Sequence, residues 1–209
     1  MAWDEALLEA APHLGRPVLR FYEWIGPAAT FGYFQKFNEV RRTTKLRPLI
    51  RRPTGGGLVP HDADWTYSLV FPSGHPWHQL KAVESYRRIH EWIQTAFGRI
   101  GTVTGLAPCC RKEGAGQCFV GAGQFDVLWQ GRKIAGAAQR RTRDGLLIQG
   151  SIQPPPGSSR SEFEKAFCET ARTQWSVEWQ PLKLDTALTE RVSELVRGKY
   201  SQKGYNERR

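Results

Sequence analysis

The stretch Arg51-Arg52-Pro53-Thr54-Gly55-Gly56-Gly57-Leu58-Val59-Pro60-His61-Asp62 is the most informative part of this chain. Three consecutive glycines do not pack a core. Glycine reaches positive φ and lets a ligand lie directly against main-chain N–H groups. Flanked by an arginine pair and by His-Asp, the run predicts a binding loop for an anionic or thioester-bearing substrate. A glycine hairpin with solvated charges is the alternative, because one glycine-rich loop is a weak signal.

A second informative segment spans residues 125–152, FDVLWQGRKIAGAAQRRTRDGLLIQGSI. Two strand-like runs flank a small-residue element that carries Lys133, with turn signals at 130–131 and 144–145. A lysine beside the small residues 135–137 lies where backbones approach closely, so little bulk shields its ammonium group. The pattern favours a positive charge aimed into a cavity, although most lysines in hairpins are solvated.

Length, composition and charge limit the class of protein. A chain of 209 residues with 40% hydrophobic content can fill one core, and no composition break indicates a linker, so one domain over residues 1–209 is expected. The absence of a long apolar stretch or signal-peptide pattern predicts a soluble cytoplasmic protein. The net charge of +10 attracts nucleic acid or acidic proteins. No zinc-finger spacing, RNP-like run or recognition-helix signature favours nucleic acid, and charge alone leaves both kinds of partner open.

The hydrophobic pattern predicts an α/β (α+β) fold with mixed or antiparallel sheets and flanking helices. Helical spacing recurs at 3–11, 80–100, 161–173 and 185–200. Short β-branched or aromatic runs predict strands at 17–24, 29–34, 65–71, 125–129, 146–153 and 175–179. Ser161, with Glu164 at capping-box spacing, is the expected N-cap of the third helix.

Several motifs in order resemble one known family. They are Arg51 to Gly57, His61-Asp62, Thr66-Tyr67-Ser68 and the run Gly-Arg-Lys-Ile-Ala-Gly-Ala-Ala-Gln at 131–139. Together they resemble the lipoate protein ligase and octanoyltransferase family of the biotin/lipoate ligase superfamily, and the resemblance covers essentially the whole chain. It implies a biotin/lipoate ligase-like catalytic domain. Its usual partners are acyl carrier protein and lipoyl domains, which are acidic.

The cysteines bear on the chemistry. The chain has four cysteines, Cys109, Cys110, Cys118 and Cys168. They form no CxxC pair and no histidine stands near the first three, so no metal site is expected. Cys168 falls in a helical pattern, where a buried inert thiol is usual. Cys118 lies in a glycine-rich stretch near Arg111 and Lys112, a setting that favours the nucleophilic thiolate. From the residues alone, the alternative that Cys118 is a buried structural cysteine remains open.

The resemblance assigns roles. In the cysteine-dependent octanoyltransferases the nucleophile occupies a Cys-Phe pair shortly before a strand of the type Phe125-Asp126-Val127, which implies that Cys118 forms an acyl-enzyme. Lys133 would then hydrogen-bond the carbonyl oxygen as negative charge develops. The acceptor would be a lysine of a lipoyl domain, from a 2-oxoacid dehydrogenase subunit or the glycine cleavage H protein. No cofactor, membrane or nucleic acid is implied, and a monomer is expected. The expected substrate-binding residues are Arg51, Arg52, Thr54, Gly55, Gly56, Gly57, His61, Gly136 and Ala137.

Transferase and ligase remain the two enzyme alternatives. The compact run from His61 through Asp64 to Ser68 resembles the cysteine octanoyltransferases, whereas Gly57 is more typical of the ligases, and Gln149 stands where a histidine is common. A lipoate ligase would need ATP and Mg²⁺ and would form a lipoyl-adenylate. A basic binding module without chemistry is the non-enzymatic alternative, and the glycine motif disfavours biotin ligase.

Overall fold

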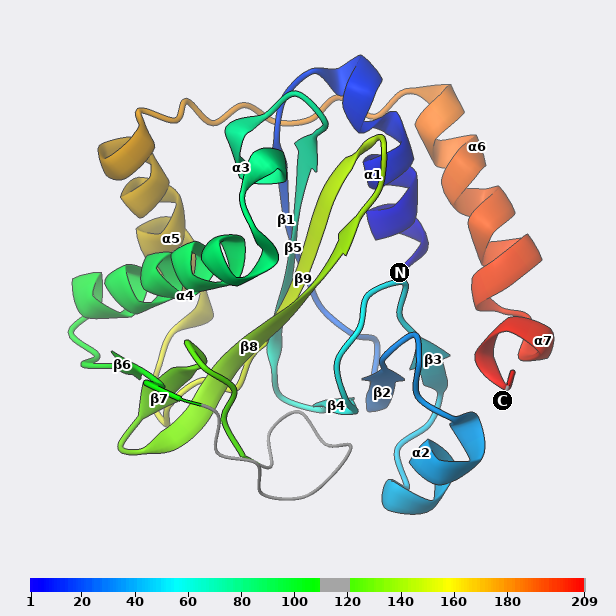
Figure 1. Cartoon of the computed structure of the whole chain (residues 1–209), viewed down its shortest axis with the longest axis horizontal. Coiled ribbons are helices and arrows are strands. Elements are labelled where there is room, and N and C mark those ends of the chain that lie inside the picture. The colour runs from blue at the N-terminus through cyan, green and yellow to red at the C-terminus, as the bar shows by residue number, and fades with distance from the viewer. Residues whose placement is uncertain (110–120, 209) are drawn as a thin grey trace.

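The computed structural model describes residues 1–109 and 121–208, which form two sheets with helices around them (Figure 1). The six-stranded sheet is antiparallel throughout, in the order β1 (Val18–Tyr22), β5 (Trp65–Pro72), β9 (Gly145–Ile152), β8 (Arg132–Arg141), β7 (Val127–Trp129) and β6 (Gly105–Leu106). In the three-stranded sheet, β2 (Ala28–Phe31) pairs in parallel with β3 (Leu49–Arg51) and antiparallel with β4 (Val59–His61).

Helices cover both faces of the large sheet. On one face α4 (Ala82–Arg99) and α5 (Arg160–Trp175) pack on side chains such as Leu69 and Ile148. On the other face α1 (Ala2–Leu14) and α6 (Thr186–Leu195) pack on Val70 and Leu147. Successive strand residues point to opposite faces, so central strands buried on both sides are apolar along most of their length.

Four shorter elements complete the chain. They are α2 (Phe37–Thr43), which lies beside the small sheet, α3 (Pro76–Gln79), the π-helical turn η1 (Val196–Tyr200) and α7 (Lys203–Asn206). None of these short elements was predicted as a separate unit, because each is too brief to show a hydrophobic period. In the described ranges, no helix is both long enough and apolar enough to cross a membrane.

The predicted fold class, an α/β fold with mixed or antiparallel sheets and flanking helices, is confirmed. All four predicted helices are present, with ends shifted by a few residues. The strand predicted at 175–179 is wrong: Trp175 ends α5, and Ser176 turns the chain with a positive φ of 53°. The predicted N-cap is also wrong, because the side chain of Ser159, not Ser161, accepts from the N–H of Glu162.

The small-residue element around Lys133 is a ten-residue strand, β8. Alanine and glycine have little strand propensity, which is why the sequence did not predict it. The expected turn at residues 130–131 is confirmed by positive φ at Gln130 and Gly131. Where β8 pairs with β9, Ala137 lies opposite Gly150 and Gly136 lies opposite Ser151. Small side chains on two adjacent strands leave open space above the sheet.

Candidate active site

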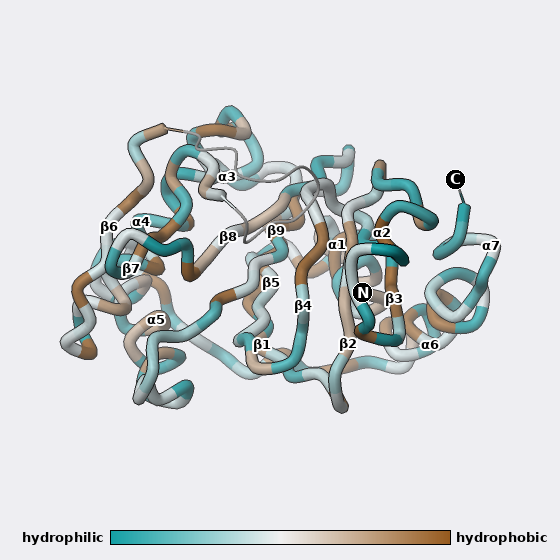
Figure 2. Tube along the Cα trace, turned by 90° about the horizontal axis from the view of Figure 1, so that it is seen from below, coloured by the Kyte–Doolittle hydropathy of each residue, from teal (hydrophilic) through white to brown (hydrophobic). Residues whose placement is uncertain are grey.

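That space is a cavity of about 50 Å³ between the two sheets. Figure 2 shows β4 and β2 running beside β5 and β9, with β8 farther along the large sheet. Strands from both sheets supply most of the cavity wall, together with Met1 and Arg52. The lining residues are Met1, Tyr22, Thr30, Arg52, Val59, His61, Thr66, Lys133, Gly136, Ala137, Ala138, Gln149, Gly150 and Ser151.

Arg52 supplies a cation on the small-sheet side of the cavity. Its guanidinium donates to Thr30 Oγ1 at 3.0 Å and to the carbonyls of Gly55 and Gly57, both at 2.8 Å. The side chain is almost fully buried. The glycine run therefore folds around Arg52 and fixes where its charge lies. This arrangement places a rigid donor, able to bind carboxylate or phosphate, at the cavity.

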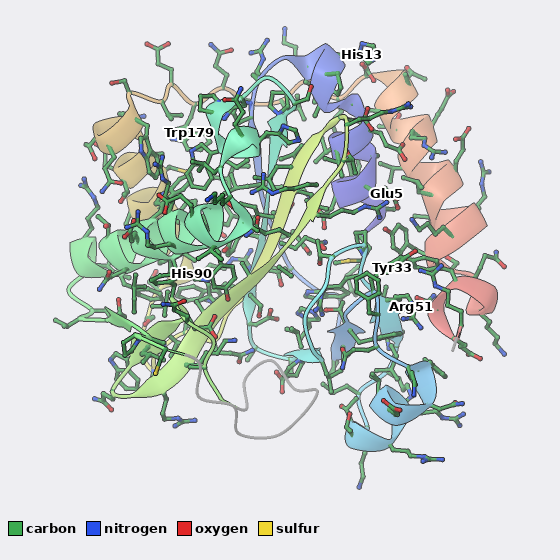
Figure 3. The ribbon with its side chains drawn as sticks, in the orientation of Figure 1. Glu5, His13, Tyr33, Arg51, His90 and Trp179 are labelled. Carbon is green, nitrogen blue, oxygen red and sulfur yellow. The ribbon has the colours of Figure 1, made fainter. Side chains whose placement is uncertain are left out.

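The preceding residue, Arg51, has a different position. Its guanidinium binds five backbone carbonyls, those of Tyr33, Gln35, Tyr205, Asn206 and Arg208. Burial lowers the pKa of Arg51. Figure 3 shows Arg51 and Tyr33 beside the C-terminal segment. Arg51 thus ties the end of the chain to the small sheet and is not among the residues that line the cavity.

Within the glycine run, Gly56 makes a close backbone contact with Gly32. A Cβ on Gly32 would lie 1.9 Å from the carbonyl oxygen of Gly56, and Gly56 itself has φ of 87°. Thr54 Oγ1 donates to Gln149 Oε1 at 2.7 Å, which links the loop to the large sheet. Gly55, Gly56 and Gly57 are not among the lining residues. Their described contacts are with Arg52 and Gly32.

His61 lies in a chain of buried hydrogen bonds. Its Nδ1 donates to Asp64 Oδ2 at 2.9 Å, and its Nε2 is 2.8 Å from Thr30 Oγ1, which also accepts from Arg52. The ring stacks on Trp24 with centroids 4.2 Å apart. Asp64 accepts further hydrogen bonds, from the Thr66 and Ser151 hydroxyls. His61 is therefore held rigidly, and its acidic partner is Asp64 rather than the adjacent, exposed Asp62.

Lys133 supplies the second cation, on the large-sheet side. Its ammonium lies 2.7 Å from Asp126 Oδ2, and its side chain is only 10% exposed. A Cβ on Gly136 would lie 2.8 Å from Lys133 Cε and 2.9 Å from Nζ. The missing side chain at Gly136 thus makes the room in which the lysine amine lies.

Asp126 is itself held by other donors. The N–H of Gly123 donates to Oδ2 at 2.6 Å, and the Tyr86 hydroxyl donates to Oδ1 through a short hydrogen bond. Burial, followed by the negative charge of Asp126, raises the pKa of Tyr86 well above its ordinary value. A carboxylate that accepts from several donors is fixed in position and in turn fixes the ammonium it binds.

His90 lies next to this cluster, on the side of α4 that faces β8 (Figure 3). Its Nδ1 donates to the carbonyl of Tyr86 at 2.8 Å, and its ring lies 4.2 Å from the Tyr86 ring. Burial lowers the pKa of His90 to about 4, so the imidazole is neutral at physiological pH. The negative charge of Asp126 is therefore balanced by Lys133 and not by the histidine.

A third buried carboxylate, Asp4, braces the cavity from the side of α1. It binds Arg20 at 2.8 Å and accepts from Ser68 Oγ and Gln149 Nε2, each at 2.7 Å. Burial alone would raise the pKa of Asp4. The nearby Met1 amino group and Arg20, together with the hydrogen bonds from Ser68 and Gln149, lower it instead. Gln149 thereby connects α1 through Asp4 to the glycine loop through Thr54.

The structure brings together five of the expected site residues at one cavity: Arg52, His61, Lys133, Gly136 and Ala137. Thr54 lies behind the wall, in contact with Gln149. Cys118, the expected nucleophile, and Cys110 lie outside the described residues. Cys109 is exposed, and Cys168 is half-buried on α5, where burial raises the pKa of its thiol.

Sequence reasoning missed the supporting residues of both walls. Asp64 lies in the same short motif as His61, and Asp126 directly precedes β7, so both had a signal in their position. Tyr86, His90 and Thr30 had none, because each comes from a helix or strand whose pattern is that of a core element. No group of three or more histidine, cysteine or acidic side chains that could hold a metal ion occurs within residues 1–109 and 121–208.

Comparison with known proteins identifies the family of this chain. Residues 1–168 match the model of the lipoyl protein ligase A/B catalytic domain. The chain belongs to this family. Relatives include the octanoyltransferase LipM of Carboxydothermus hydrogenoformans, 37% identical over 158 residues (73% of this chain and 59% of the relative), and that of Staphylococcus epidermidis, 35% identical (73% and 60%). The chain thus spans about three-fifths of the length of these relatives.

Solved structures share the fold at lower identity. A putative lipoate protein ligase of Thermoplasma acidophilum superposes with a TM-score of 0.81 at 21% identity, covering 99% of this chain and 92% of that one. A lipoate-protein ligase A solved with ATP gives a TM-score of 0.78 at 20% identity, with 99% and 92% coverage. The family resemblance inferred from motifs is confirmed by the family model and the octanoyltransferase relatives, and these structures confirm the fold.

Proposed function

We propose that this protein moves an octanoyl group from acyl carrier protein to a lysine of a lipoyl domain through a thioester on Cys118. The observation that carries the proposal is Lys133, whose nearly buried ammonium is held against Asp126 at the wall of a cavity with small-residue strands as its floor. Such a donor, fixed before the substrate arrives, stabilises the oxyanion of an acyl-transfer transition state. The names of the relatives support the same reaction class.

The chemistry has two balanced steps. The Cys118 thiolate attacks the octanoyl thioester and forms a new C–S bond, the C–S bond to the carrier breaks, and the carrier leaves as a thiolate that takes up a proton from water. The amine of the target lysine then attacks the enzyme thioester, loses a proton and forms an amide, which releases the Cys118 thiolate. Lys133 donates to the carbonyl oxygen in both steps. The first exchange is nearly balanced in free energy and the amide drives the second, so the scheme consumes no nucleotide.

The decisive experiment follows the acyl group. The protein mixed with octanoyl-carrier protein, without ATP, should gain one octanoyl mass on the peptide that contains Cys118, and hydroxylamine should remove it. Cys118→Ser should lose amide transfer, because an alcohol is a far weaker nucleophile near neutral pH. Cys109→Ser and Cys110→Ser are matched controls and should stay active. Unmodified Cys118 in an active enzyme would overturn the thioester step.

Lipoate protein ligase is the second candidate, because the structural neighbours carry that name and one was solved with ATP. In that reaction Lys133 and Arg52 would hold the carboxylate and phosphate of a lipoyl-adenylate, with ATP and Mg²⁺ as reactants. A ligase predicts the opposite pattern: lipoylation from free lipoate that requires ATP and survives Cys118→Ser with a modest loss.

A further inference from the structure

One surface outside the cavity combines an exposed aromatic side chain with basic side chains. It consists of Phe34, Arg41, Arg42 and Lys45, from the segment around α2, and we call it the α2 surface. Phe34 is 86% exposed, and the three basic residues are exposed as well. Within the described part of the chain, none of these three forms an ion pair. The three basic residues line an open notch of about 470 Å³, together with Thr43, Thr44 and Arg47.

Other cations near the α2 surface already have structural roles. Arg47 donates to the carbonyls of Thr44 and Leu46, beyond the end of α2, at 3.0 and 2.7 Å. Lys36 pairs with Glu39 at 3.3 Å. Arg41, Arg42 and Lys45 differ in having no described acidic partner. Their charge is therefore available to a partner molecule.

The α2 surface adjoins the wall of the cavity. The N–H of Tyr33 donates to the carbonyl of Thr54 at 2.9 Å, and Gly32 packs against Gly56. Phe34 is thus one residue from a segment in direct contact with the glycine loop. That loop holds Arg52, which lines the cavity. In Figure 1, α2 lies at the same end of the molecule as β2 and β4.

We propose that the α2 surface docks the acidic carrier protein that delivers the acyl thioester, an inference that rests on the proposed function. An exposed aromatic anchor with charges around it is a usual composition for a protein interface, and opposite charge speeds and orients encounter. The donor's arm is joined through an anionic phosphodiester, which suits the three cations of the α2 surface, since none of them has an ion-pair partner among the described residues. The lipoyl domain is acidic as well, but its reacting group is a cationic lysine without a phosphodiester, so the carrier's arm is the better match for these charges. A nucleic acid delivers no acyl thioester, so it is not the partner expected for a surface that adjoins the cavity wall.

The test separates docking from chemistry. We would measure octanoyl transfer with varied octanoyl-carrier protein, and carrier binding by fluorescence anisotropy, for the protein as it stands and for Arg41→Gln/Arg42→Gln. Loss of two charge contacts should raise both KM for the carrier and Kd about tenfold at low salt, with kcat unchanged. The difference should shrink as salt screens the charges. Turnover of octanoyl-N-acetylcysteamine, a thioester without the carrier, should not change. Phe34→Ser, which leaves every charge in place, should weaken carrier binding at all salt concentrations.

Lys165→Gln/Lys183→Gln is the matched control, since both lysines are exposed and have no ion pair within the described residues. It removes the same charge and should leave KM for the carrier unchanged. Equal effects of both double variants would reduce the result to net charge and overturn the docking surface. The docking surface would also be overturned if Arg41→Gln/Arg42→Gln changed only the KM for the acceptor, or weakened only the binding of a single-stranded RNA probe. If the protein binds the carrier through the α2 surface but transfers no octanoyl group, the proposed function fails while docking stands.

Discussion

The two walls of the cavity are built in different ways. On the small-sheet wall, Arg52 and His61 are joined through Thr30, and the histidine's carboxylate is only three residues along the chain. On the large-sheet wall, Lys133 depends on Asp126, which in turn is held by Tyr86, 40 residues earlier in a helix. Residues that are close in sequence, such as His61 and Asp64, leave a motif. Thr30 and Tyr86, which reach the walls from distant elements, can be found only in the folded molecule.

Lys133→Ala is the strongest test of the large-sheet wall. Removing a donor aimed at a developing oxyanion should lower kcat of octanoyl transfer by about 10² to 10³. Asp126 keeps the Tyr86 hydroxyl and the Gly123 N–H as donors, so the protein should still fold, which thermal unfolding checks. The exposed neighbour Arg132→Ala is the control and should keep normal turnover. Near-normal turnover of the Lys133 variant would remove the lysine from the mechanism.

The adjacent arginines sharpen the comparison on the small-sheet wall. Arg51→Met should lower the free energy of unfolding by about 3 kcal/mol or more, because five carbonyls lose a charged donor. The remaining folded protein should keep kcat/KM within about threefold. Arg52→Met should instead lower kcat/KM about tenfold or more, since its charge lies at the cavity. Urea unfolding and octanoyl-transfer kinetics on both variants measure these effects. A larger loss of kcat/KM in Arg51→Met than in Arg52→Met would mean that Arg51 binds substrate.

Sequence and structure differ in a way that follows from these walls. The glycine run and the Gly-Arg-Lys motif pointed to the cavity, and Arg52, His61, Lys133, Gly136 and Ala137 do line it. The two arginines could not be told apart in sequence, because their side chains point in different directions from consecutive positions of an extended segment. Strand β8 was missed since its small residues, which open the cavity, carry no strand signal. Thus the small residues that make room for the cavity are the same residues that weaken the strand pattern of the sequence.

His90 offers a pH-dependent test of the large-sheet wall. Its folded pKa of about 4 lies below the unfolded value near 6.5, so the native state binds fewer protons between these values. Its contribution is fully present above pH 6.5 and is lost as pH falls toward 4, up to about 3 kcal/mol. Urea unfolding from pH 7 to pH 4 should show a steeper loss for the native sequence than for His90→Leu. Parallel curves would mean that His90 does not titrate in this window.

Two glycines on facing strands separate stability from activity. A Cβ on Gly150 would lie 2.1 Å from Cζ of the buried Tyr67 ring, so Gly150→Ala should cost about 2 kcal/mol or more of stability through overpacking. At Gly136 the new methyl group would meet the flexible end of Lys133 instead. Gly136→Ala should therefore change stability by less than about 1 kcal/mol and lower kcat about tenfold by displacing the amine. Thermal unfolding and single-turnover rates measured on both variants distinguish these effects. Equal losses of stability would contradict the difference between the two positions.

Tyr86→Phe gives the smallest and most specific change. The substitution removes one hydroxyl and keeps the ring that packs against His90, so the loss is confined to the short hydrogen bond to Asp126 and a long one, 3.5 Å, from the N–H of Ala137. Asp126 retains Lys133 and the Gly123 N–H, and the expected loss of stability is about 1 to 2 kcal/mol. If Tyr86 positions Lys133 through Asp126, kcat should fall severalfold with KM unchanged, and adding Lys133→Ala should produce little further loss beyond the lysine variant alone. Additive losses in that double-mutant cycle would show that the tyrosine supports the fold without acting through the lysine.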